Sequence, residues 1–170
     1  MKFCPMCGMP QLEAGLNVCQ FCNYEEKPIE ELSKREIHDL LTSYEYQRIE
    51  DGIRINAVKN IRDIALRGAV ALPYFVSEIA ADAFSHCKFI SRIELPRELR
   101  SIGDGAFTSY RDLFDVFIPM GVSYIGRGAF SDCYDLSVIR CAAPMQPDGW
   151  NNEWLFACSA KVEWSSTDEE

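Results

Sequence analysis

The feature that most constrains the fold is a 23-residue repeat, which runs from Leu72 to Cys141. Three landmarks keep the same step: an Ala-Phe pair, a proline and an isoleucine. Their copies are Ala83-Phe84, Ala106-Phe107 and Ala129-Phe130, then Pro73, Pro96 and Pro119, then Ile79, Ile102 and Ile125. A period of this length is typical of stacked repeats, in which each unit buries its apolar face against its neighbours. The sequence therefore predicts a short solenoid.

Each unit contains a short strand that ends near the proline. Ile93 and Leu95 are two residues apart, so both side chains point to the same side of a strand and into the core. The residues between them face outward, and the strands of successive units should pair as a parallel ladder. After the strand, the Ile102-Gly103 step fills the return side of the coil, where we expect the glycine to permit the turn toward Ala-Phe. The phenylalanines of the Ala-Phe pairs should stack inside the coil.

The repeat has a specific resemblance to a known family. The segment from Val76 to Cys87, VSEIAADAFSHC, and its two later copies resemble the BspA-like leucine-rich repeat family of bacteria. The unit of that family carries a proline, a valine, an Ile-Gly step, Ala-Phe and a cysteine in that order. The resemblance covers about residues 44–164 and implies an α/β solenoid that is mostly β. It also implies a non-enzymatic protein, since known members are often surface adhesins or protein-binding modules.

Four cysteines near the amino terminus have the spacing of metal ligands. Cys4 and Cys7 form one Cys-x-x-Cys pair, eleven residues follow, and Cys19 and Cys22 form a second pair. Two such pairs direct four thiolates at one ion, and the pattern resembles the short zinc ribbons of many bacterial proteins. About 25 residues bury too little surface to fold alone, so structural Zn²⁺ should supply about 10 kcal/mol of folding free energy. The alternative is a redox-active Cys-x-x-Cys, which needs a βαβ context that is missing here.

Residues 26–43 are predicted to be a linker followed by a capping helix. Ser33 and Glu36 form a capping box, so a helix of about ten residues should begin at Lys34. Its apolar face is formed by Ile37, Leu40, Leu41 and Tyr44. A helix with one apolar face is expected to dock onto the repeats.

An N-terminal hairpin is predicted at residues 44–56, because apolar and polar residues alternate on both sides of Asp51-Gly52. The competing hypothesis is a helix with Ile49, Ile53, Ala57 and Ile61 on one face. For residues 58–68 the sequence does not decide between a helical turn and a degenerate strand near Ile64–Leu66.

The repeats should occupy about residues 64–141, followed by a C-terminal cap at 142–164. Prolines and tryptophans break the period after Cys141, and the indoles of Trp150 and Trp154 are suited to cover the last turn of a solenoid. A tryptophan-lined ligand site is the alternative. Residues 165–170 are polar and acidic, and we expect a disordered tail.

The outward strand positions are the candidate recognition surface. The 23-residue step aligns Ala71, Glu94, Phe117 and Arg140 in one row, Ala69, Arg92, Asp115 and Val138 in the next, and Tyr74, Arg97 and Met120 beyond the strand ends. The candidate partner-binding residues are Phe117, Glu94, Arg140, Arg92, Asp115, Tyr74 and Met120. Phe117 is the leading anchor, since it lies between inward Val116 and Ile118 and should stand out among charges. The competing hypothesis is that the N-terminal helix covers this stripe.

Charge and composition narrow the function classes. The net charge of -9 disfavours nucleic acid as a partner, because an acidic surface repels phosphates. A zinc-ribbon, nucleic-acid-associated regulatory protein remains the alternative to a protein-recognition scaffold. The sequence has no signal peptide or apolar segment long enough to span a membrane, and its eight cysteines fit metal-ligand and core positions, so we expect a cytoplasmic protein. His86 and Cys87 are adjacent but lack an orienting third group, so an enzyme is not expected.

Overall fold

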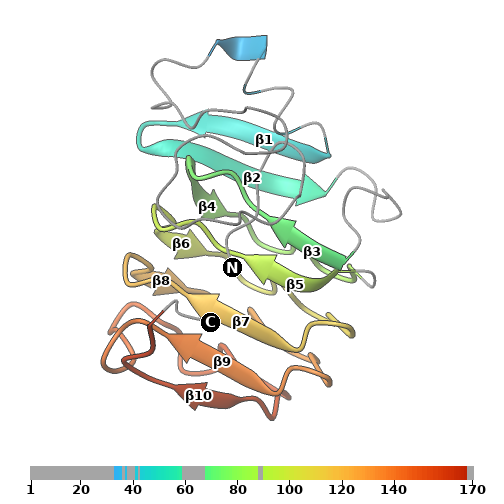
Figure 1. The fold of residues 1–170 in the computed structure, drawn as a ribbon, viewed down its shortest axis with the longest axis vertical. Helices are drawn as coiled ribbons and strands as arrows, with labels where there is room; N and C mark the ends of the chain where they lie inside the picture. Colours follow the sequence, from blue (N-terminus) through green and yellow to red (C-terminus); the bar gives the residue numbers. More distant parts are fainter. Residues whose placement is uncertain are drawn as a thin grey trace.

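The 23-residue period folds as a coil that places short strands of successive units in two sheets, on opposite sides of the coil (Figure 1). The structure is a computed structural model, which describes residues 33–35, 37, 41, 43–58, 68–87 and 90–167. Its strands are β1 (Tyr44–Ile49), β2 (Gly52–Val58), β3 (Gly68–Ala71), β4 (Val76–Ile79), β5 (Ile90–Glu94), β6 (Ser101–Ile102), β7 (Asp115–Ile118), β8 (Tyr124–Ile125), β9 (Val138–Cys141) and β10 (Lys161–Glu163).

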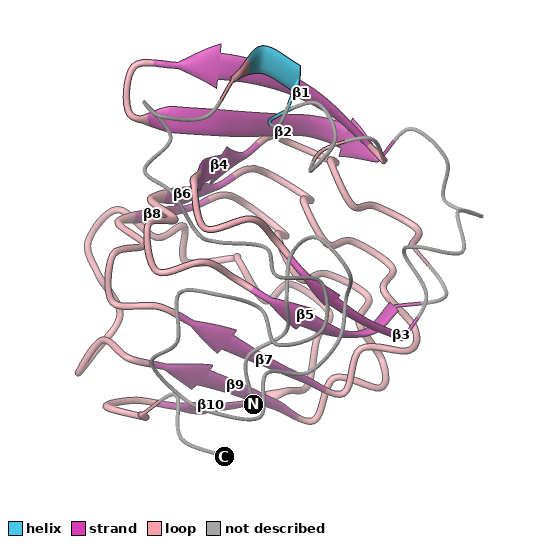
Figure 2. Ribbon diagram, turned by 45° about the horizontal axis from the view of Figure 1, so that its top comes forward, coloured by secondary structure: helices cyan, strands magenta, loops and turns pink. Residues whose placement is uncertain are grey.

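Each sheet has five strands, in the orders β1-β2-β4-β6-β8 and β10-β9-β7-β5-β3 (Figure 2). Only the β1–β2 pair among these is antiparallel, and every other pair is parallel. The register follows the sequence period, because Arg92 pairs with Asp115 and Asp115 pairs with Val138. The predicted parallel ladder is confirmed.

The coil has about four turns, although the copies of the sequence motif predicted three. The additional turn begins in β2, where Ile53 pairs in parallel with Val76, one period further along the chain. The Ala-Phe motif could not reveal this turn, because Asn60 and Ile61 stand one period before Ala83-Phe84. The second strand of the N-terminal hairpin is therefore also a strand of the solenoid.

An aromatic ladder runs through the interior, as the sequence predicted. The ring centroids of Phe84 and Phe107 are 5.4 Å apart, those of Phe107 and Phe130 are 5.0 Å apart, and both pairs are stacked. The rings of Tyr44 and Trp154 contact the two ends of the ladder. Backbone hydrogen bonds between turns hold the register, since the Phe107 N–H donates to the Ala129 carbonyl at 2.8 Å. The Phe rings belong to the core.

The glycine of the Ile-Gly step has a different role from the one predicted. Neither Gly103 nor Gly126 has a left-handed φ; instead, a Cβ at Gly126 would lie 2.5 Å from the backbone nitrogen of Asp104 in the previous turn. Close stacking of the turns therefore requires glycine here. The left-handed φ occurs elsewhere, for example at Gly105 and Gly128, each with a φ of 60°.

The N-terminal hairpin covers one end of the coil. β1 and β2 pair through Ile49 and Gly52, as predicted from the Asp51-Gly52 turn, and the competing helix is excluded. Helical hydrogen bonds begin where Ile37 N–H donates to the Ser33 carbonyl, and Ile37 and Leu41 are buried in the core. Tyr44, which the sequence also placed on the helix face, is instead the first residue of β1.

The other end is closed by tryptophans, as predicted. Trp150 and Trp154 are buried, and the indole N–H of Trp150 donates to the Val122 carbonyl at 3.0 Å, so these indoles do not line an open site. Part of the predicted cap is the strand β10, which extends the sheet beyond β9. The predicted disordered tail is wrong at its start, because Ser165 and Ser166 donate backbone hydrogen bonds to Ala143 and Cys141. Residues 168–170 lie outside the described residues.

Candidate functional site

The outward side of the sheet β10-β9-β7-β5-β3, here called the β7 face, brings the predicted partner-binding residues together. Strand pairing places Glu94 beside Ala71 and Phe117 beside Arg140, and it extends the row to Glu163 in β10. The second row contains Arg92, Asp115 and Val138, and it extends to Lys161. The register therefore agrees with the first two rows expected from the 23-residue step. The described part of the N-terminal helix lies beyond β1, away from β7 (Figure 1).

Charges of both signs alternate across the β7 face. Arg140 forms an ion pair with Asp115 on the neighbouring strand, and both side chains are about one quarter exposed. Lys161 Nζ lies 2.7 Å from Glu163 Oε1, and this hydrogen bond lowers the pKa of the glutamate. A face with paired charges of this kind is more suited to a protein than to a uniformly anionic nucleic acid.

Phe117 is at the centre of this face but is less prominent than expected. Its side chain is half-buried, whereas Val116 and Ile118 on either side point into the core. Met120 is 63% exposed just past the end of β7. Tyr74, which the 23-residue step aligns with Arg97 and Met120, is half-buried and packs edge-on against Phe75. The apolar part of the face therefore centres on β7.

Several exposed aromatic residues were missed by the sequence analysis. Phe114 is 57% exposed immediately before β7, at a variable position of the same strand pattern that contains Phe117. That shared position is the signal that would have found it. Tyr134 and Phe156 are also exposed, and the hydroxyl of Tyr134 donates to Asp132 at 3.0 Å. This hydrogen bond raises the pKa of Tyr134.

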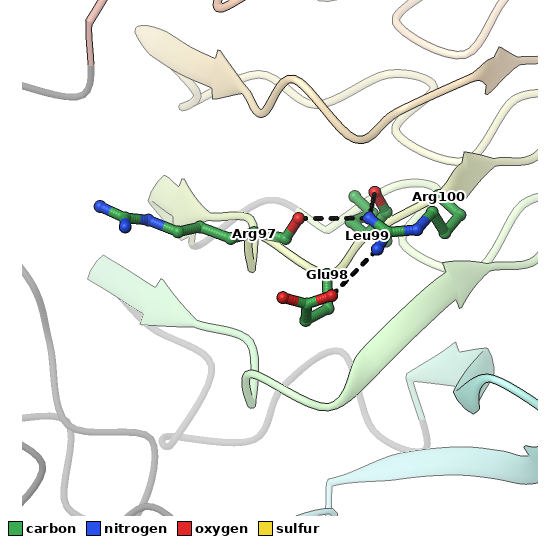
Figure 3. A network of polar contacts seen from close by, with 4 residues as sticks. All are labelled: Arg97, Glu98, Leu99 and Arg100. Atoms are coloured by element: carbon green, nitrogen blue, oxygen red, sulfur yellow. Dashed lines mark hydrogen bonds and ion pairs between the residues drawn. The ribbon is translucent and has the colours of Figure 1, made fainter. Parts of the chain in front are cut away.

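A separate open cleft of about 610 Å³ lies between the hairpin turn and the corner after β5. Its lining residues are Arg48, Ile49, Glu50, Asp51, Gly52, Glu98 and Arg100. The guanidinium of Arg100 contacts Glu98 at 3.0 Å and donates to backbone carbonyls of the same corner, while Arg97 extends away from this pair (Figure 3). The charged corner is thus largely satisfied by its own contacts.

The cysteines of the repeats behave as core residues. Burial raises the pKa of Cys87 to about 11 and the pKa values of Cys133 and Cys141 to about 12. Protonated, buried thiols are poor nucleophiles and poor metal ligands. His86 beside Cys87 is exposed, so the two side chains do not share an environment. The predicted zinc ligands Cys4, Cys7, Cys19 and Cys22 lie outside the described residues.

Within the part of the chain that the structure describes, no three His, Cys, Asp or Glu side chains are grouped so that they could hold a metal ion. The same residues form no helix that is long and apolar enough to cross a bilayer.

Comparison with known proteins identifies the repeat. Residues 43–147 match the sequence family described as "BspA type Leucine rich repeat region (6 copies)", and this match covers more than half of the 170-residue chain. The chain belongs to the BspA-type leucine-rich repeat family. This membership indicates a protein-interaction scaffold. No curated protein matches the chain.

Two solved structures are similar to this family member. One is a leucine-rich repeat protein of Treponema pallidum, with 26% sequence identity, a TM-score of 0.39, and coverage of 75% of this chain and 81% of that one. The other is a leucine-rich cell surface protein of Faecalibacterium prausnitzii, with 16% identity, a TM-score of 0.48 and coverage of 72% of this chain. The matched region spans 38% of the Faecalibacterium protein. Family membership rests on the repeat match.

Proposed function

We propose that the protein recognises another protein through the β7 face and is not an enzyme. The observation that carries this proposal is the placement of Phe117 on a rigid, hydrogen-bonded sheet, with Asp115 and Arg140 beside it. An aromatic anchor within a rim of charges is the usual composition of a protein-binding hot spot. Membership in a leucine-rich repeat family supports the same function.

The test is affinity capture from the native host with three full-length proteins, followed by quantitative mass spectrometry. These are the wild type, Phe117→Ala, and Tyr134→Ala as a control that removes another exposed aromatic side chain away from the β7 strand. We expect a captured protein that is depleted at least tenfold with Phe117→Ala and retained with Tyr134→Ala. Equal capture by all three proteins would refute recognition through this face.

We further propose that residues 1–25 form a structural zinc module held by Cys4, Cys7, Cys19 and Cys22. The support is chemical, because four thiols in two Cys-x-x-Cys pairs match the donor set and number that structural Zn²⁺ prefers. The described core needs no metal, so removing zinc should unfold the module and leave the solenoid intact. Metal analysis should find one zinc per chain, and Cys19→Ser should abolish it without changing the urea midpoint of the solenoid. Full-length protein without zinc, or a solenoid that unfolds on chelation, would contradict the proposal.

The alternative is a nucleic-acid-associated regulatory role for the zinc module. The net charge of -9 opposes it, and salt-sensitive retention on heparin or DNA would be needed to support it. We also propose a cytoplasmic location, since all four described cysteines are free thiols. Cell fractionation with an antibody against the solenoid would test this location.

A further inference from the structure

Three large apolar side chains lie within β7 or immediately beside it, and all come from one turn of the coil. Phe114 is 57% exposed before β7, Phe117 is half-buried within it, and Met120 is 63% exposed after it. They are three residues apart in the sequence. Only Phe117 lies within β7, at an outward position, whereas Phe114 precedes the strand and Met120 follows it in a turn. The apolar row therefore consists of one outward strand residue and the residues just before and after the strand.

The neighbouring turns show that the fold does not require large apolar residues at these positions. Strand register places β5 and β9 on either side of β7, one repeat unit away in each direction. The positions equivalent to Phe114, Phe117 and Met120 are Ser91, Glu94 and Arg97 in one turn and Ser137, Arg140 and Ala143 in the other. The stacking of turns is the same at all three strands. Exposed apolar side chains that packing does not need are typical of a binding site.

The β5 side of this row is basic. β5 and the corner after it carry Arg92, Glu94 and Arg97, and among the described residues neither arginine side chain has an ion-pair partner. In Figure 3 the side chain of Arg97 extends away from the neighbouring Glu98–Arg100 ion pair. On the β9 side, Arg140 is neutralised by Asp115.

We infer that the partner is an acidic segment with apolar anchors, which lies along β7. Its apolar side chains contact Phe114, Phe117 and Met120. Its carboxylates face the guanidinium groups of Arg92 and Arg97, which are suited to bidentate contacts with carboxylates. This inference rests on the proposed function, because it names the class of partner that the β7 face selects.

The experiment is selection of a random 16-residue peptide display library on the full-length protein, with affinities of the enriched peptides then measured at two salt concentrations. We expect enriched peptides to combine Asp or Glu with spaced aromatic or aliphatic residues, and to bind more weakly at high salt. Phe117→Ala should weaken binding by about 30-fold, as for a central hot spot. Phe114→Ser, which introduces the residue found in the two neighbouring turns, and Arg97→Glu should each weaken it by about tenfold.

A matched control is Arg127→Glu, which makes the same charge reversal at an exposed arginine outside the β7 face, paired with Glu153. Its affinity should equal that of the wild type, and urea unfolding should show that every variant is folded. Enriched peptides that are basic or uncharged, yet depend on Phe117, would overturn the partner class and leave recognition by the β7 face standing. Peptides unaffected by all the β7-face variants, or no enrichment, would overturn both.

Discussion

Replacement of Tyr110 by phenylalanine should stabilise the protein. Tyr110 occupies the repeat position held by cysteine in the flanking turns, and its side chain is fully buried. Among the described residues its hydroxyl has no hydrogen-bond partner, and burial raises its pKa well above the ordinary value, so the phenol stays neutral. An unsatisfied buried hydroxyl costs about 1–3 kcal/mol. The ring itself is retained by phenylalanine, including its edge contact with Phe107 at 6.0 Å between centroids.

We therefore expect Tyr110→Phe to raise the free energy of unfolding by about 1 kcal/mol. With a urea m-value of about 2 kcal/mol per molar, the midpoint should rise by about 0.5 M. The control is Tyr134→Phe, because that hydroxyl is exposed and hydrogen-bonded to Asp132, and its removal should change stability by less than about 0.5 kcal/mol. A loss of about 1 kcal/mol in Tyr110→Phe would refute the reasoning, since it would mean that the hydroxyl is satisfied, for example by a buried water.

Three further predictions concern the stacked core. Phe107→Ala, in the middle of the aromatic ladder, should lower the free energy of unfolding by about 3–5 kcal/mol in urea titrations, and a loss below 1 kcal/mol would contradict tight packing there. Gly126→Ala should lower the free energy of unfolding more than Gly68→Ala. The new Cβ at position 126 would lie 2.5 Å from the backbone of Asp104, whereas a Cβ at position 68 would meet no atom within 4 Å and would be strained only by the φ of 75°. Stability should fall as pH rises above about 9, because Cys133 keeps its proton to about pH 12 when folded and loses it near 8.5 when unfolded. The loss is at most about 1.4 kcal/mol per pH unit for each such thiol, and a Cys133→Ala variant with an unchanged slope would exclude this cause.

Most of the repeat architecture could be predicted because the same physical requirement recurs at every turn. The inward position of Val116 and the stacking of Phe107 follow from alternation and from the 23-residue step, and both hold in the structure. The rows of the β7 face follow from the same step, so their membership needed no tertiary information.

The first turn and the glycine positions could not be predicted correctly, for two different reasons. The first turn keeps the strand register at Ile53 but lacks the Ala-Phe motif. A repeat count based on that motif therefore omits this turn. The role of Gly126 depends on how closely Asp104 of the previous turn approaches, which is a distance between turns and not a property of the local sequence. The polar, acidic composition predicts a disordered tail from Ser165, whereas the backbone N–H of Ser165 donates a hydrogen bond to the Ala143 carbonyl.

The exposed fraction of individual side chains also could not be predicted from the sequence pattern. Alternation places Phe117 outward, but it gives no measure of how far neighbouring side chains cover it, and the ring is half-buried. Phe114 also occupies a variable position of the repeat pattern, and its side chain is far more exposed than that of Phe117. Alternation thus predicted the outward position of Phe117 in β7, and the exposure of Phe114 was missed.

The separation between scaffold and recognition surface can be tested within one turn of the coil. Phe107 and Phe117 are ten residues apart in the same turn, but one ring is fully buried between two other rings and the other lies on the outward side of β7. Phe107→Ala should lower stability and, where the protein remains folded, leave the affinity for a β7-face peptide within about twofold. Phe117→Ala should do the reverse, with a change in stability below about 1 kcal/mol, because removing a half-buried outward ring leaves no enclosed cavity. If Phe117→Ala destabilised the protein as much as Phe107→Ala, the outward ring would be part of the core and could not act as an independent anchor for a partner.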